Sequence, residues 1–348
     1  MSILSKNKHH NKPNTMKTFF IRKLTRAAFM ALIPSIVLAT SIYSALLSYS
    51  APESGQWVMA TPEAPFQGRS GHTGTVFKNR MWIIGGWNGN SGLNDVWYSR
   101  DGKTWICATR NAPFRERAAH TAIVFDNKLW IIGGLTYDRE KNIIDLNDVW
   151  YTSDGAHWVC AAPHAGFTSR GGHSSVVFRD RIWVIGGIAC SADVWSSRDG
   201  VHWDRATRTA EFGSRGGQST AVLNNEIVLI GGMYVDNENR FNSLKDVWIS
   251  SDGSRWRKVH HSEGFFAGGG QSCAVIDGRL WVMGGFRKSG AIFASRNGSE
   301  WEHIDGSAEF GERVAHTCIA FKDRIWVIGG YTGARHTSDV WSASPGQL

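Results

Sequence analysis

A pattern of arginine followed three residues later by histidine is the part of this sequence best suited to bind a charged group. Four copies contain both residues, one copy pairs arginine with glutamine, and one has glycine and glutamine in their places, which gives five arginines and four histidines. The six copies are Arg69/His72, Arg117/His120, Arg170/His173, Arg215/Gln218, Gly268/Gln271 and Arg313/His316. A ring of guanidinium groups binds a carboxylate or sulfate through paired hydrogen bonds. The pattern is equally compatible with a structural role, in which each arginine satisfies backbone carbonyls between neighbouring units of the fold.

A set of aromatic residues at or near paired glycines indicates a surface that binds a sugar ring or a peptide. The set comprises Trp87, Tyr137, Tyr234, Phe286 and Tyr331. Trp87 differs from the other sixteen tryptophans, because those all fall at repeated positions that predict packing between units. Some of these rings could instead be the last inward residues of strands. We predict that this aromatic set and the five arginines bind the ligand.

Catalytic chemistry has little support in the sequence. A catalytic site must break the equivalence of repeated units, and no nucleophile, base and orienting group do so together. Glu116, Glu211 and Glu312 could act as general acids or bases, or they could be solvated charges in linkers. No cysteine has a CxxC partner, so a zinc site is not expected and free thiols are. We therefore predict no catalytic residue, no metal and no cofactor.

These residues belong to a unit that the chain repeats six times. Each unit has a hydrophobic run closed by two glycines, and the glycine pairs lie 48, 53, 45, 53 and 45 residues apart. Five units also contain Asp-Val-Trp, whereas the fifth unit reads Ala291-Ile292-Phe293. Together these motifs resemble the kelch repeat family over about 290 of the 348 residues. Because kelch propellers have a period of about 50 residues, the resemblance implies an all-β, six-bladed kelch-type β-propeller.

Each unit is expected to form four short strands rich in valine, isoleucine and tryptophan. Pairs such as Asp101-Gly102 predict tight turns between the third and fourth strands. Residues 56–61 repeat the fourth strand of a unit, while the sixth unit ends without one. We predict that this N-terminal strand completes the last blade and closes the ring. Strand parity then places the tight turns on one face and the variable loops, longest at 137–146 and 234–244, on the other.

The N-terminal region differs from the repeats in charge and hydropathy. Residues 1–26 form a basic lead with seven Lys or Arg and no acid, which leaves 31 basic against 30 acidic residues elsewhere. The nearly neutral repeats offer no field for phosphates, so nucleic acid is not an expected partner. Residues 27–47 carry no charge and predict either a transmembrane anchor helix or a signal peptide. A linker at 48–54 and the propeller at 55–348 follow, and the positive flank predicts an extracytoplasmic, periplasmic propeller that is anchored, or secreted if the segment is cleaved.

The predicted function is binding without catalysis. We expect a monomeric module, displayed outside the cytoplasm, that holds a protein or carbohydrate ligand on its loop face. The alternative is a sugar-modifying enzyme. The sequence also resembles bacterial sialic-acid mutarotases, which are exported six-bladed kelch propellers, and that resemblance implies interconversion of sugar anomers.

Overall fold

The structure is a computed structural model that describes residues 57–348 except 189–191, 239, 287–289 and 305–307. The basic lead, the apolar segment at 27–47 and the linker at 48–54 lie outside the described residues. Within the described ranges, no helix has the length and apolar character needed to cross a membrane. The regular structure is almost entirely β, as the repeats predict.

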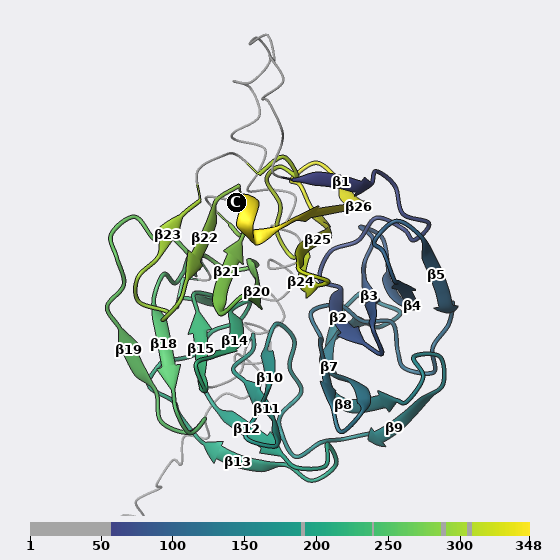
Figure 1. The fold of residues 1–348 in the computed structure, drawn as a ribbon. Helices are drawn as coiled ribbons and strands as arrows, with labels where there is room; N and C mark the ends of the chain where they lie inside the picture. Colours follow the sequence, from purple (N-terminus) through teal and green to yellow (C-terminus); the bar gives the residue numbers. More distant parts are fainter. Residues whose placement is uncertain (1–56, 189–191, 239, 287–289, 305–307) are drawn as a thin grey trace, which may run out of the picture.

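Six four-stranded antiparallel sheets surround a central axis as the blades of a propeller (Figure 1). Blades 1 and 2 contain β2 (Thr73–Phe77), β3 (Arg80–Trp87), β4 (Gly92–Ser99), β5 (Trp105–Thr109), β6 (Thr121–Phe125), β7 (Lys128–Tyr137), β8 (Ile143–Thr152) and β9 (Trp158–Ala162). Blades 3 and 4 contain β10 (Ser174–Phe178), β11 (Arg181–Ile185), β12 (Val194–Ser197), β13 (Asp204–Thr207), β14 (Ser219–Leu223), β15 (Glu226–Ile230), β18 (Val247–Ser250) and β19 (Arg257–Val259). Blades 5 and 6 contain β20 (Ser272–Ile276), β21 (Arg279–Met283), β22 (Ile292–Ser295), β23 (Glu302–His303), β24 (Thr317–Phe321), β25 (Arg324–Tyr331), β26 (His336–Ala343) and β1 (Val58–Thr61). A separate ribbon of β16 (Met233–Val235) and β17 (Phe241–Ser243) extends from blade 4, and a 3-10 turn, η2 (Pro345–Gln347), follows β26.

The tight turn between the third and fourth strands of a blade also packs against the neighbouring blade. In blade 2, the Asp154 carboxylate accepts the backbone N–H groups of Ala156 and His157, which holds the turn between β8 and β9. Gly155 in this turn has a φ of +88° and lies against the indole of Trp82 in blade 1. A side chain at Gly155 would collide with that ring. The strand-two tryptophans therefore pack between blades, as predicted.

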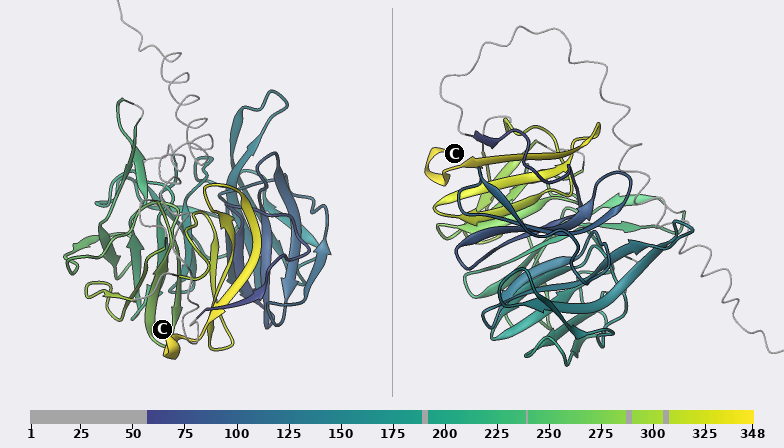
Figure 2. Two further views of the ribbon diagram at one scale, coloured as in Figure 1. Left: turned by 90° about the horizontal axis from the view of Figure 1, so that it is seen from above. Right: turned by 90° about the vertical axis from the view of Figure 1, so that its right-hand side faces the viewer.

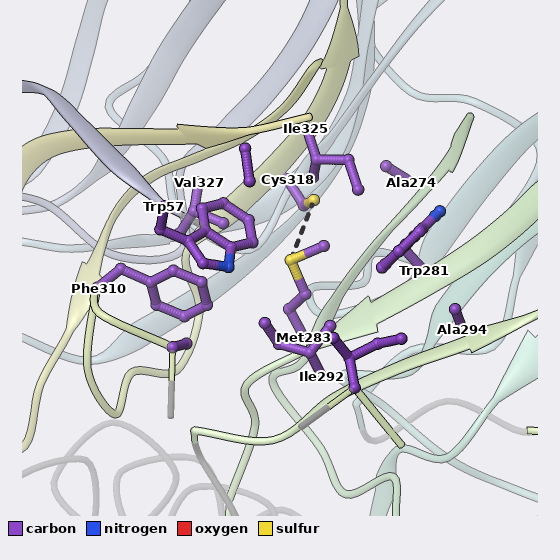
Figure 3. Close-up of a cluster of buried hydrophobic side chains, with 13 residues drawn as sticks. Trp57, Ala274, Trp281, Met283, Ile292, Ala294, Phe310, Cys318, Ile325 and Val327 are labelled. Atoms are coloured by element: carbon purple, nitrogen blue, oxygen red, sulfur yellow. Dashed lines mark hydrogen bonds between the residues drawn. The ribbon is translucent and has the colours of Figure 1, made fainter. Parts of the chain in front are cut away.

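The N-terminal strand closes the ring, and this prediction is confirmed. β1 pairs antiparallel with β26, with Val58 opposite Ser342 and Met59 opposite Trp341. Just before β1, Trp57 enters the apolar cluster shared by blades 5 and 6. Figure 3 shows its indole beside Phe310, with ring centroids 4.8 Å apart, near the sulfur contact of Met283 and Cys318. Closure leaves no open edge between the first and last blades.

The two faces of the propeller differ as strand parity predicts. The start of β1 pairs with the end of β26, so both described chain ends lie on the face of the tight turns. Figure 2 (left) shows the C-terminus on that side, while the teal β7–β8 hairpin and the green β16–β17 ribbon rise from the opposite face. We call this opposite face the loop face. Four of the five cysteines lie in the described residues, and all four are free thiols.

Candidate functional site

A closed ring of six backbone hydrogen bonds surrounds the propeller axis at the loop face. Each blade contributes one residue whose N–H donates to the carbonyl of the equivalent residue in the preceding blade, at 2.7–2.9 Å. The ring residues are Gly71, Ala119, Gly172, Gly217, Gly270 and Ala315, and all have a φ between 52° and 71°. Glycine adopts this left-handed conformation without steric penalty, and alanine adopts it at a cost of about 1–2 kcal/mol. The sequence signal is a glycine or alanine directly before each histidine or glutamine of the repeated pattern, and sequence reasoning missed it.

The histidines and glutamines form a buried layer directly next to this ring. The His72 Nε2 atom lies 3.1 Å from the Ile328 carbonyl oxygen of blade 6, so the side chain links two blades. In the same way, Gln218 and Gln271 donate to carbonyls of the preceding blades at 2.8 and 2.9 Å. Burial, and then the charge of the adjacent arginine, lowers the pKa of His72, His173 and His316 to about 3 and that of His120 well below its ordinary value. The imidazoles are neutral at pH 7.

The five arginines lie inside the blades and do not reach the axis. Their side chains are 0–2% exposed, and each guanidinium binds both carboxylate oxygens of the aspartate in Asp-Val-Trp. The pairs are Arg69–Asp95, Arg117–Asp148, Arg170–Asp193, Arg215–Asp246 and Arg313–Asp339. The same guanidinium also donates to the first carbonyl of the paired glycines, as Arg117 does to Gly133 at 2.9 Å. The arginines therefore have the structural role that the sequence left open, although their partners lie within one blade and not between blades.

The tryptophan of Asp-Val-Trp completes this arrangement. The indole N–H of Trp150, for example, donates to Asp148 at 2.7 Å. Burial on its own would raise the pKa of Asp339, but the hydrogen bonds and charge of Arg313 hold it below its ordinary value. Blade 5 replaces the three residues together, with Gly268, Ala291 and Phe293. This joint replacement is visible in the sequence and was the missed signal that arginine, aspartate and tryptophan form one unit.

Breaking one such unit is expected to destabilise the fold strongly. Arg117→Met leaves the mostly buried Asp148 carboxylate without its cation, so the free energy of unfolding should fall by about 3–5 kcal/mol. The triple variant Arg117→Met/Asp148→Ala/Trp150→Phe removes all three members of the unit, as blade 5 does, and should lose less stability than the single variant. Urea denaturation of both variants measures the difference. A triple variant that is less stable than the single one would contradict this explanation.

Trp87 and Tyr137 form an aromatic pair on the loop face. Trp87 ends β3 of blade 1 and Tyr137 ends β7 of blade 2, and their ring centroids lie 4.7 Å apart with 44° between the planes. Both side chains are partly buried. Burial raises the pKa of Tyr137 to about 12, so its phenol is protonated and available to donate a hydrogen bond. The structure thus brings together two of the predicted aromatic residues from neighbouring blades.

The other three predicted aromatics lie apart from this pair. Tyr234 stands on the β16–β17 ribbon and is 42% exposed. Tyr331 is buried, because its ring packs on His336 and its hydroxyl donates to the Gly333 carbonyl at 2.6 Å. Phe286 is partly buried beside the ring residue Gly270. Tyr331 therefore matches the alternative of a last inward strand residue.

A cavity of about 150 Å³ lies on the axis beside Trp87. The hydrogen-bonded ring and the histidine and glutamine layer form its wall, together with Ser70, Ala118 and Trp87. None of these lining residues carries a carboxylate. The acids considered from sequence are exposed: Glu116 and Glu312 point to solvent, and Glu211 accepts the backbone N–H of Trp256 at 3.1 Å. Within the described part of the chain, no three metal-ligating side chains come together.

Two hairpins with internal side-chain hydrogen bonds rise from the loop face. At the tip between β7 and β8, Asp138 accepts the backbone and side-chain N–H groups of Asn142 at 2.7 and 2.9 Å. On the β16–β17 ribbon, Asp236 accepts hydrogen bonds from Arg240 and Asn242 at 2.9 and 3.0 Å. These bonds join the two strands of each hairpin near its tip. The site therefore consists of an aromatic pair and an axial cavity between two projecting hairpins.

Comparison with known proteins agrees with this architecture. The family model of the KLHDC2/KLHL20/DRC7 Kelch-repeats domain matches residues 42–187, and the Kelch motif matches residues 312–342. A solved structure titled "Structure of YjhT" is similar over 81% of this chain and 96% of that chain, with 17% sequence identity and a TM-score of 0.64. No curated protein sequence matches the chain. At this identity the solved structure shows a shared fold alone. From the repeat motifs, the six blades and the family matches, the chain belongs to the kelch-repeat β-propeller family.

Proposed function

We propose that this propeller is a non-catalytic binding module that holds a protein or glycan ligand on its loop face. The observation that carries the proposal is the Trp87–Tyr137 pair beside the axial cavity. Aromatic rings supply large contact areas at low entropic cost, and such rings dominate binding energy in interfaces. A ligand placed on this pair would also meet the two hairpin tips.

The pair breaks the equivalence of the six blades, as a specific site must. The residue after the paired glycines is aromatic in blades 1, 5 and 6 (Trp87, Phe286 and Tyr331) and aliphatic in blades 2, 3 and 4 (Leu135, Ile188 and Met233). Trp87 packs on an aromatic ring of the neighbouring blade, whereas Tyr331 packs on His336 of its own blade. The structural arginine units, by contrast, recur in five blades. Recurrent features of a propeller serve packing, and loops on such a scaffold carry function. The unique aromatic pair is therefore the best candidate for ligand contact.

The positions of the chain ends suit display of the loop face. β1 begins on the tight-turn face, so a preceding membrane segment would attach there and leave the loop face directed away from the membrane. We accordingly propose that residues 27–47 anchor or export the protein and that the propeller lies outside the cytoplasm. The mass of the mature chain distinguishes an anchored from a cleaved protein. A cytoplasm-dependent reporter fused after Leu348 that gives strong signal would refute extracytoplasmic display.

Substitution of the aromatic pair tests the binding site. The full-length protein in lipid nanodiscs would be screened on a glycan array and with a displayed library of short random peptides. For any ligand found, Trp87→Ala and Tyr137→Ala should each weaken binding about 30-fold or more, because they remove central aromatic contacts. Lys103→Ala, an exposed change on the tight-turn face, is the matched control and should bind like the parent.

Two outcomes would contradict the proposal. Unchanged ligand affinity in both aromatic variants, with folding intact, would place the site elsewhere. Accelerated mutarotation of a sialic acid by the purified protein would show catalysis and would favour the enzyme alternative. A non-catalytic module leaves that rate at the level of buffer.

A further inference from the structure

We infer that the axial cavity is an anchor pocket for one apolar side chain of a protein partner. This inference rests on the proposed function and makes it more specific, because it selects a protein ligand over a glycan. The partner's backbone would lie across the loop face between the two hairpin tips. One side chain would enter the cavity beside Trp87.

The backbone N–H groups of the axial ring have no hydrogen bond left to donate to a ligand. All six ring N–H groups donate to ring carbonyls. Above the ring, Ser70 exchanges two backbone hydrogen bonds with Trp87, and Ala118 exchanges two with Leu135. The wall therefore presents the Cα and methyl groups of glycine and alanine and the indole of Trp87, with the Ser70 hydroxyl among its polar groups.

The histidine and glutamine layer also offers few hydrogen-bonding atoms to an entering side chain. Nε2 of His72, Gln218 and Gln271 is used by carbonyls of the preceding blades. Both ring nitrogens of His120 and His316 lack a protein partner but are buried within the protein, as are the side-chain oxygens of the two glutamines. Burial and the nearby arginines keep these imidazoles uncharged. A hydroxyl or charge moved from water into such a wall loses its hydration without replacement, whereas an apolar group does not.

The dimensions of the cavity match a side chain and not a larger group. A cavity of about 150 Å³ with an apolar wall holds a molecule the size of benzene, and this cavity has that volume. A leucine or phenylalanine side chain is similar in size to benzene. Central pockets that bury one such residue usually supply most of the affinity of a protein interface. Tyr137 packs behind Trp87 and fixes that part of the wall.

Small amides test the pocket in the full-length protein. The probes are N-acetyl-leucinamide and N-acetyl-phenylalaninamide, compared with N-acetyl-serinamide and N-acetylglucosamine. Incorporation of 5-fluorotryptophan reports on Trp87 by ¹⁹F NMR, with Trp87→Phe assigning its resonance. We expect the two apolar amides, at millimolar concentration, to shift the Trp87 resonance. The serine amide and the sugar should leave it in place.

A cavity-filling variant supplies the matched control. Ala118→Leu adds bulk to the wall and should weaken binding of the apolar amides at least about tenfold, a typical effect of blocking a central pocket. Should this variant fail to fold, Ala118→Val replaces it, because Val314 occupies the equivalent position in blade 6. Tyr234→Ala, which changes an exposed residue outside the lining, should bind the amides like the parent.

The inference fails if no apolar amide shifts the Trp87 resonance up to its solubility limit. It also fails if the sugar or the serine amide shifts that resonance as strongly, or if the filled variants bind the apolar amides unchanged. These failures differ from failure of the proposed function. A protein whose ligand binding depends on Trp87 and Tyr137, but whose cavity takes no apolar amide, is still a binding module.

Discussion

Lowering the pH from 7 to 4 is expected to unfold the propeller, because four histidines that stay neutral in the folded protein bind protons when the chain unfolds. The folded-state pKa is about 3 for His72, His173 and His316, and well below the ordinary value for His120. An unfolded histidine titrates near pH 6.5. Between these values the unfolded chain binds more protons, so the stability is complete above pH 6.5 and is lost as the pH falls.

The expected loss is large because the four histidines act together. Each proton bound only by the unfolded state lowers the free energy of unfolding by about 1.4 kcal/mol per pH unit. Four histidines thus remove about 5 kcal/mol per unit below pH 6, against a total stability on the order of 5–15 kcal/mol. Asp246 and Asp339, whose pKa is lowered by their arginine partners, contribute little in this window, because an unfolded aspartate titrates near pH 3.9 and their effect on stability lies below that value.

The chain contains its own control for this effect. Gln218 and Gln271 occupy the same layer in blades 4 and 5 and donate to the carbonyls of the preceding blades. The variant His72→Gln/His120→Gln/His173→Gln/His316→Gln should therefore fold at pH 7 and lose most of the pH dependence. Urea denaturation at intervals from pH 4 to pH 8 compares it with the parent. An equally steep loss of stability in the glutamine variant would show that other groups control acid unfolding.

Truncation of Trp57 is the second change expected to have a large effect, because this residue locks the closing strand. Its indole is 5% exposed and packs on Phe310 in the cluster between blades 5 and 6 (Figure 3). Trp57→Ala leaves a cavity there and should lower the free energy of unfolding by about 3–5 kcal/mol. Weakened closure also exposes strand edges, so we expect aggregation at lower temperature.

Val58 on the same strand provides the comparison. Its side chain is 53% exposed, so Val58→Ala should change the stability by no more than about 0.5 kcal/mol. Thermal and urea unfolding of the two variants measure the difference. Equal stability of the parent and Trp57→Ala would mean that the N-terminal strand does not hold the ring closed.

Much of the fold follows from the sequence because its determinants are local and repeated. Glycine pairs end the second strands, Asp-Gly pairs make tight turns, and the tryptophan strand around Trp57 has a counterpart in every complete unit. These regularities predict six blades, the closing strand and the two unlike faces. Each depends on residue type at a fixed spacing, which a single sequence displays.

The site was harder to predict because its determinants lie far apart in the chain. Arg117 and Asp148 are 31 residues apart and meet only when three strands pair, so the arginine pattern alone could not show that its charge is neutralised. The axial ring is made of backbone groups, so its only mark in the sequence is the glycine or alanine before each histidine or glutamine. The contact of Trp87 with Tyr137 depends on the relative orientation of blades 1 and 2. The sequence named Trp87 and Tyr137 as candidates, but only the structure shows that they meet, and their contact with a ligand stays a prediction.

Site-specific photo-cross-linking tests the central claim, binding at the loop face, most directly. p-Benzoylphenylalanine would replace Arg139 at the tip between β7 and β8, or Lys103 in a tight turn on the opposite face; both side chains are exposed. With the ligand selected by the array or the peptide library, we predict a covalent adduct from position 139 and none from position 103. The adduct should disappear when Trp87→Ala is added. Cross-linking from position 103 alone, or adducts at position 139 that persist without Trp87, would contradict a loop-face binding module.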